Sequence, residues 1–220
     1  MAAHTGTAKG DVTVVEPTRA QRALARRVAE AKATVPDLPL EAEVDLTAAP
    51  ATGVALDVVL AAATARALRA VPEANASYRD GRFERYARVN VGLTVLTDDG
   101  FVVPTLFDAD RRPLDELAAA AAELTERVHA QTITAAELSG ATCTVSHLGA
   151  HGIDAYVPAL QAPQAAAAGL GAVRDRPVVR DGALAVAPVA TLTVACDARI
   201  LYGATAAAFV NAVRDAMQAP

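Results

Sequence analysis

Hydrophobic and polar positions follow two distinct periods along the chain. In some segments apolar residues recur every three or four positions, which is typical of a helix with one buried face. Other segments alternate apolar and polar residues or form short apolar runs, which is typical of strands. The predicted helices cover residues 19–32, 57–71, 113–131 and 203–217, with one further helical turn at 134–140. The predicted strands cover residues 40–46, 76–80, 82–86, 89–97, 101–107, 141–146, 165–173 and 184–196.

The order of these elements predicts the class of fold. Helices and strands mix without strict βαβ alternation, and tight turns join several strand pairs, including a hairpin at Asp80 and Gly81. Such an order favours a mixed or antiparallel sheet that is covered by helices on one side. Residues 1–15 are polar and lack periodicity, so we expect a flexible N-terminal tail followed by one domain over residues 16–220.

Composition excludes several classes of protein. The chain has 220 residues, 53% of them hydrophobic, and a formal charge of −5, which argues against disorder and against a nucleic-acid binder. Its apolar runs are too short to span a bilayer, and the N-terminus lacks the apolar core of a signal peptide. Two cysteines fit a reducing compartment, so we expect a cytoplasmic protein. No P-loop, GxGxxG or zinc-ligand spacing occurs, and no metal site is expected.

Candidate chemistry gathers at two places. His147 and His151 lie in one glycine-containing loop directly after a predicted strand, and Ser146 ends that strand. Glycine loops let side chains approach a ligand closely, so the serine could be a nucleophile, an oxyanion donor or a residue that merely satisfies the turn. At the second place a buried strand runs into Asp197 and Arg199, which either line a site or form an ion pair that fastens a turn.

The ordered motifs of residues 16–219 resemble one family throughout. They resemble the catalytic domain of the 2-oxo acid dehydrogenase acyltransferases (dihydrolipoyl acyltransferases), which share their fold with chloramphenicol acetyltransferase. The resemblance implies a two-layer α/β fold, with a mixed sheet covered by helices, and a homotrimer with each site between two chains. The matching segments are residues 26–27, 43–45, 71–77, 97–104, 140–149, 163–165, 171–173, 176–179 and 197–203.

The site segment departs from the family pattern at two catalytic positions. The family reads Asp-His-Arg-x-x-Asp-Gly, where the histidine is the general base, but this chain has Ala198 in place of the histidine and Tyr202 in place of the second aspartate. In the family that aspartate pairs with an arginine of the first helix, which corresponds to Arg27 here. Ser146 matches the serine that stabilises the oxyanion, and His147 replaces an asparagine.

Three explanations for Ala198 stay open at this point. The chain is a working acyltransferase with a deliberate His→Ala change, a natural pseudoenzyme kept as a scaffold, or an enzyme with a remodelled site. In the last case His147 or His151 would serve as the base. Because Ala198 accepts no proton, we expect a rate loss of about 10²–10⁴-fold in the chain as written.

The resemblance also implies a substrate class. We expect transfer of an acetyl group from acetyl-CoA to a hydroxyl of a small molecule, as in the stand-alone acyltransferases that act on tetronate intermediates. A dihydrolipoyl acyltransferase-like core or an inactive scaffold is the alternative. Acetyl-CoA would be a cosubstrate, with no tightly bound cofactor. The other residues assigned to this site are His147, His151 and Cys196 as substrate contacts, and Arg27, Asp197, Arg199 and Gly203 as its structural support.

Overall fold

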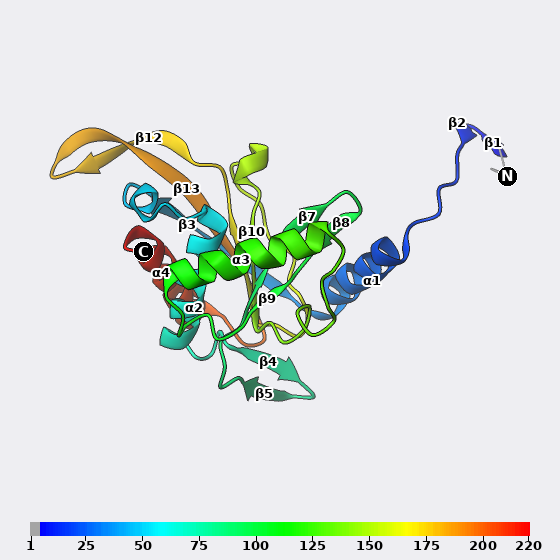
Figure 1. Ribbon diagram of the computed structural model, residues 1–220, viewed down its shortest axis with the longest axis horizontal. Coiled ribbons are helices and arrows are strands. Elements are labelled where there is room, and N and C mark those ends of the chain that lie inside the picture. The colour runs from blue at the N-terminus through cyan, green and yellow to red at the C-terminus, as the bar shows by residue number, and fades with distance from the viewer. Residues whose placement is uncertain (1–4) are drawn as a thin grey trace.

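One mixed sheet of seven strands organises the chain, and the computed structural model describes residues 5–220 (Figure 1). The main path runs β12-β13-β11-β10-β6-β9, and β3 pairs with β13. Strand β10 is parallel to both of its neighbours, and the remaining pairs are antiparallel, which confirms the predicted mixed sheet. The strands are β3 Asp37–Asp45, β6 Val91–Leu93, β9 Thr105–Leu106, β10 Cys143–His147, β11 Ala166–Leu170, β12 Arg174–Arg180 and β13 Ala183–Asp197.

Strand β13 is the longest strand and carries three partners. Its residues pair with β3 on one edge, while β11 and β12 follow each other along the opposite edge. Leu170 faces Leu192 and Arg174 faces Val189, so three residues between β11 and β12 oppose only two on β13. This extra residue is a β-bulge, which bends the edge at the start of β12. Strand β12 was not predicted from the sequence.

Three helices cover one face of the sheet, as predicted. Their bounds are α2 Leu56–Ala70, α3 Leu114–His129 and α4 Gly203–Gln218. Helix α2 packs on β6, β10 and β11, α4 packs on α2 and β3, and α3 packs on α2 (Figure 1). Alternate residues of each strand point into this layer because side chains alternate between the faces of a strand. The core includes Leu60, Leu68, Val145, Leu192 and Phe209, all fully buried.

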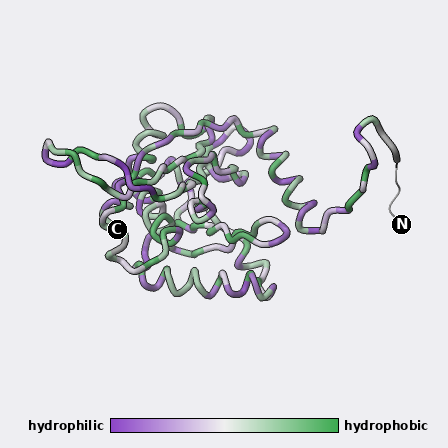
Figure 2. The backbone as a smooth tube through the Cα atoms, turned by 90° about the horizontal axis from the view of Figure 1, so that it is seen from above, coloured by the Kyte–Doolittle hydropathy of each residue, from purple (hydrophilic) through white to green (hydrophobic). Residues whose placement is uncertain are grey.

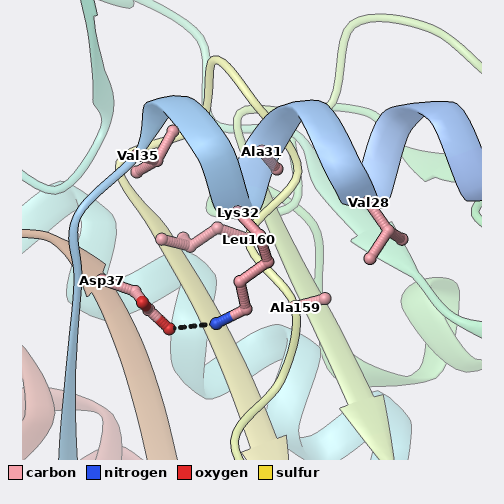
Figure 3. A pocket seen from close by; sticks show the side chains of 7 residues that line it. All are labelled: Val28, Ala31, Lys32, Val35, Asp37, Ala159 and Leu160. Atoms are coloured by element: carbon pink, nitrogen blue, oxygen red, sulfur yellow. Dashed lines mark hydrogen bonds and ion pairs between the residues drawn. The ribbon is translucent and has the colours of Figure 1, made fainter.

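Helix α1, Arg19–Thr34, is placed differently from the other three. Thr18 and Gln21 form a capping box at its start, which satisfies two free backbone amides. Its far end reaches the other face of the sheet, where Val35 and Leu160 join Ala167 and Ala195 in a second small core. Figure 3 shows this junction, where Lys32 also forms an ion pair with Asp37 at 2.5 Å.

Small hairpins and broken strands account for the differences from the predicted elements. The predicted strand 89–97 is divided into β6 and β7, and 101–107 into β8 and β9. Residues 5–12 form a hairpin where a tail was expected, while residues 1–4 of that tail lie outside the described residues. Residues 134–140 form turns instead of a helix. The hairpins are β1 Thr5–Thr7 with β2 Gly10–Val12, β4 Ala76–Arg79 with β5 Arg82–Arg85, and β7 Val95–Thr97 with β8 Gly100–Val102.

Two segments project from the body on opposite sides. Residues 5–17 lead away from the body beyond α1, and the β12–β13 hairpin extends on the other side (Figures 1 and 2). No helix within residues 5–220 is long and apolar enough to cross a membrane.

Candidate active site

Strand β10 places Ser146 on the face of the sheet opposite α2. Cys143 and Val145 point into the core beneath the helices, so the alternating residues Thr144 and Ser146 point to the other face. There they line a cavity of about 240 Å³ that is mostly apolar. The rest of its wall is formed by Thr94, Leu96, Phe101, Leu148, Tyr156, Val157, Pro158, Ala159, Gln161 and Ala167.

A tyrosine that sequence reasoning missed lies directly against the serine. The hydroxyl of Tyr156 is 2.6 Å from Ser146 Oγ, a short hydrogen bond between two hydroxyl groups. Burial raises the pKa of Tyr156, while its hydrogen bond to Ser146 opposes that rise. The only feature of the sequence that could have pointed to Tyr156 as a site residue was its place, as an aromatic residue with a hydroxyl group, in an alanine- and proline-rich loop. Ser146 and Tyr156 therefore form a hydroxyl pair in the cavity wall.

A second, larger cavity adjoins the first. It has a volume of about 440 Å³, and it shares Phe101, Thr144 and Gln161 with the cavity of Ser146. Arg27 lines this larger cavity from α1. Gln164 lies in its wall and accepts a hydrogen bond from Thr144 Oγ1 at 2.8 Å. The two cavities together make a depression with an apolar end and a polar end.

The turn after β13 is held by a buried ion pair. Asp197 is 1% exposed and accepts two hydrogen bonds from the Arg199 guanidinium, at 2.9 and 2.7 Å. The same guanidinium donates to the Thr34 carbonyl and lies over the Tyr78 ring, and Asp197 raises the pKa of Arg199. These contacts tie the turn to the end of α1 and to β4.

Ala198 lies between these two charged residues in the turn. Its side chain is partly exposed, and its backbone N–H donates to the Pro36 carbonyl at 2.9 Å. Gly203 then opens α4 with φ of 53°, in the left-handed region that favours glycine. The backbone of the turn is thus fixed by groups other than the Ala198 side chain.

The remaining residues predicted for this site do not share one cavity. Tyr202 is 62% exposed and lines a separate pocket of about 170 Å³ with Glu73, Phe83 and Arg85, so the chain does not bring it to the cavity of Arg27. Cys196 was expected to contact substrate. Its side chain is instead enclosed in the core, and burial raises its thiol pKa to about 12.

The two loop histidines do not reach Ser146 either. His147 follows Ser146 on β10, so its ring points to the opposite face, where burial lowers its pKa and Asp57 opposes that effect. His151 is exposed at the end of the short 3-10 helix Gly149–His151. Neither imidazole lines the cavity of the serine. Within residues 5–220, no group of three His, Cys, Asp or Glu side chains could hold a metal ion.

Within one chain, Ser146 and Ala198 are far apart. Ser146 lies beside Gly169, which lies beside Thr193, so two strand spacings separate Ser146 from β13. Ala198 is five residues beyond Thr193. At about 3.3 Å per residue and 4.8 Å per strand, the separation is roughly 16 Å along the sheet and roughly 10 Å across it. A single chain cannot bring the two positions to one reacting atom.

Comparisons with known proteins identify the class of this fold and site. Residues 9–220 match the family model of the 2-oxoacid dehydrogenases acyltransferase (catalytic domain). The chain belongs to this family. Chloramphenicol acetyltransferase superposes with a TM-score of 0.54 at 14% identity, over 87% of this chain and 94% of that one, which confirms the expected fold.

Individual relatives agree with this assignment. The chain is 29% identical over 215 residues to the dihydrolipoyllysine-residue acetyltransferase component of the Staphylococcus aureus pyruvate dehydrogenase complex, covering 91% of this chain and 50% of that protein. It therefore spans about half the length of the curated relatives it matches. The dihydrolipoamide acetyltransferase of Azotobacter vinelandii superposes with a TM-score of 0.91 at 29% identity, over 96% of this chain and 93% of that one.

Proposed function

We propose that this chain is an acyltransferase core domain whose reaction moves an acyl group between CoA and a dihydrolipoyl thiol. One observation carries the proposal. The A. vinelandii structure comes from a study of a serine, a histidine and an asparagine in that enzyme's catalytic mechanism. The histidine lies 52 positions after the serine, and the asparagine four positions after the histidine. Ser146, Ala198 and Tyr202 have the same two spacings here.

The chain has the serine hydroxyl that would stabilise the oxyanion in the proposed reaction. As the acceptor thiolate attacks the thioester carbonyl, the carbonyl oxygen becomes negative and accepts a hydrogen bond from Ser146. The intermediate then collapses, the carbon–sulfur bond to CoA breaks, and the CoA sulfur leaves as a thiolate. One such donor contributes about 10²–10³-fold to the rate. The apolar cavity suits a short acyl group or the hydrocarbon chain of a dihydrolipoyl dithiol, and it limits the access of water.

Position 198 does not supply a general base for the proposed reaction. Position 198 would take the proton from the attacking thiol, but an alanine methyl group cannot, so the thiol must ionise unaided. We expect a rate about 10²–10⁴-fold below that of a histidine-bearing enzyme. The second candidate function is a core that assembles without turnover. It is favoured by His147 pointing away from Ser146, since no imidazole of residues 5–220 then lines that cavity.

The proposed acceptor is a thiol instead of the hydroxyl expected from the sequence. The relatives named above are dihydrolipoyllysine or dihydrolipoamide acetyltransferases, and these similarities give no support to a tetronate or other natural-product alcohol. The alternative stated with the sequence, a dihydrolipoyl acyltransferase-like core, therefore has the better support. Acetyl-CoA remains the proposed cosubstrate, and a cytoplasmic location remains a prediction.

The site is proposed to form between neighbouring chains of a homotrimer. The separation of Ser146 from Ala198 within one chain supports this arrangement, because the serine must meet residue 198 of another copy for the two to act together. A closed ring lets every copy give its serine to one neighbour and position 198 to the other.

Restoring the base tests the reaction. The variant Ala198→His, alone and with Tyr202→Asn, is expected to transfer acetyl groups from acetyl-CoA to dihydrolipoamide about 10²–10⁴-fold faster than the unaltered chain. Adding Ser146→Ala should remove most of this gain. If neither variant transfers acetyl groups to any thiol, and calorimetry detects no CoA binding, the enzymatic proposal is wrong and the assembly core remains.

Mixing two chains that each lack one of the two groups tests where the site forms. Ala198→His/Ser146→Ala has a base but no serine, while the unaltered chain has a serine but no base. Subunits mixed under dissociating conditions and reassembled should gain activity that neither protein has alone, since hybrid interfaces combine both groups. Activity no higher than the sum of the separate proteins would contradict a site between chains.

A further inference from the structure

The hydrogen bond between Ser146 and Tyr156 restricts the directions in which the serine proton can point. A serine hydroxyl rotates among three staggered positions, so an unpartnered serine would spread its proton over several directions. Here Tyr156 lies 2.6 Å from Ser146 Oγ and occupies one of them. Whichever hydroxyl donates in this bond, the other can donate elsewhere.

The packing of the tyrosine fixes where its own hydroxyl lies. Its ring crosses β11 at Gly169, where a Cβ atom would come within 2.9 Å of the ring and 3.0 Å of the hydroxyl. Gly169 is the direct neighbour of Ser146 in the sheet, so the missing side chain lets the phenol lie beside the serine. The loop that carries Tyr156 is held at Gly171, whose backbone passes close to the Asp154 carbonyl.

The proposed role of Ser146 requires one of the two possible directions of this bond. Either hydroxyl can donate in it, but a serine that donates to Tyr156 has no proton left for an acyl oxygen. When the Tyr156 hydroxyl donates to Ser146 Oγ, the serine proton is left to point into the cavity. Hydrogen bonds arranged in such a chain polarise one another, which strengthens the last donor.

We propose that Tyr156 is a positioning residue for acyl transfer: its hydroxyl donates to Ser146 Oγ and aims the Ser146 proton at the acyl oxygen. The inference rests on the proposed function for its chemistry, but the orientation of Ser146 is a property of this chain alone. Tyr156 acts only through Ser146, and its ring also forms part of the cavity wall.

Deleting one oxygen tests this role without disturbing the packing. In the Ala198→His background, Tyr156→Phe is expected to lower kcat about tenfold, less than loss of the direct donor, and to change the KM for acetyl-CoA less than about twofold. In an Ala198→His/Ser146→Ala background it should have no further effect. Tyr86→Phe is the matched control, because Tyr86 also donates to a serine, Ser77, at 2.9 Å outside the cavity. This control should leave kcat unchanged.

Crystal structures of the unaltered chain and of Tyr156→Phe give a second measurement that needs no activity. Ser146 is expected in one rotamer in the first and in more than one, or a new one, in the second. An unchanged kcat in the active background, or an equal loss with and without Ser146, would overturn the proposal. If Ala198→His is inactive, the proposed function fails, and the Ser146 rotamer decides: one unchanged rotamer in both structures also rejects the role of Tyr156.

Discussion

At the scale of single residues, the turn after β13 combines a fixed backbone with a replaceable side chain. Asp197 is buried and its charge is matched by Arg199, which is partly exposed and bonded to Thr34. A buried carboxylate is tolerated where its charge is paired and hydrogen-bonded, and removing one partner of such a pair is strongly unfavourable. The ion pair thus supports the site by holding the turn in place.

Removing Asp197 should destabilise the protein far more than removing an exposed aspartate. Asp197→Ala is expected to lower the free energy of unfolding by about 2–4 kcal/mol, because Arg199 loses its partner and the Arg199 backbone N–H loses its acceptor. Asp215→Ala removes the partner of Arg214 on the surface and should cost less than about 1 kcal/mol. Urea unfolding of both variants measures the difference, and equal losses would contradict this account.

At the scale of elements, the β12–β13 hairpin is attached to β3 through charged side chains. Arg180 donates to Asp45 and to Thr47, and Arg176 pairs with Glu43 at 2.7 Å. The face that carries Val179, Leu184 and Val186 is exposed in the single chain. The hairpin therefore depends on its polar contacts near the body and on strand pairing.

The Asp45 contacts predict a dependence of stability on pH. Hydrogen bonds from Thr47 and Arg180 lower the pKa of Asp45 to about 2. Since the folded pKa lies below the unfolded value of about 3.9, this stabilisation is complete above pH 4 and is lost as the pH falls toward 2. Solvent screening limits it to about 1 kcal/mol. Asp45→Asn should flatten the pH dependence of urea unfolding between pH 5 and 2, and an unchanged slope would contradict the assignment.

Gly169 in β11 and Gly171 directly after it should differ in their tolerance of a methyl group. A Cβ at Gly171 would lie 1.9 Å from the Asp154 backbone oxygen, while a Cβ at Gly169 would meet the Tyr156 side chain at 2.9 Å. Side chains yield more easily than backbone, so Gly169→Ala is expected to cost about 1–3 kcal/mol and Gly171→Ala more. Unfolding by urea ranks the two, and the reverse order would contradict the placement of the loop.

At the scale of the whole molecule, the sheet separates the two halves of the proposed site within each copy. Ser146 lies two strands away from β13, level with Thr193, and Ala198 lies directly beyond the end of β13. In the proposed arrangement function would depend on assembly, because the hydroxyl and position 198 would meet only across an interface. The exposed sites in a single chain are therefore expected to be covered or completed by neighbours.

The assembled mass tests this directly. Sedimentation equilibrium is expected to give three times the chain mass of 22.5 kDa, or a larger multiple of three. Ala198→His should assemble in the same way, since the Ala198 backbone is already held by Pro36. A monomer at micromolar concentration would contradict both the trimer and the site between chains.

Sequence periodicity predicted the bounds of α1, α2, α3 and α4 to within two residues. It missed β12, where Pro177 and three arginines in the segment obscure a strand that is defined by pairing with β13. The predicted strand 89–97 is broken at Thr94, whose backbone N–H donates to Val145 on another strand. Such interruptions arise from tertiary contacts and leave no periodic signal.

From the sequence, only those residues of the candidate site that lie within the family motifs could be predicted. Ser146 and the turn at 197–203 followed from the resemblance, and alternation along β10 could have separated Ser146 from His147. Tyr156 could not be found in this way, because its contact with Ser146 depends on how a loop folds over Gly169. The burial of Cys196 follows from the alternation of side chains along β13, because Cys196 lies on the face of that strand that is turned toward the helices.

In the turn that carries Ala198, thermal stability and catalytic turnover are expected to depend on different groups. Its shape is set by Asp197, Arg199 and the Pro36 carbonyl, so exchanging the methyl group at 198 for an imidazole leaves those restraints untouched. A library of substitutions other than proline at this codon, ranked by melting temperature, would therefore look uniform, although its members could differ a thousandfold in turnover. Melting temperatures therefore cannot rank the activity of variants at position 198, and an assay of the product is needed for this purpose.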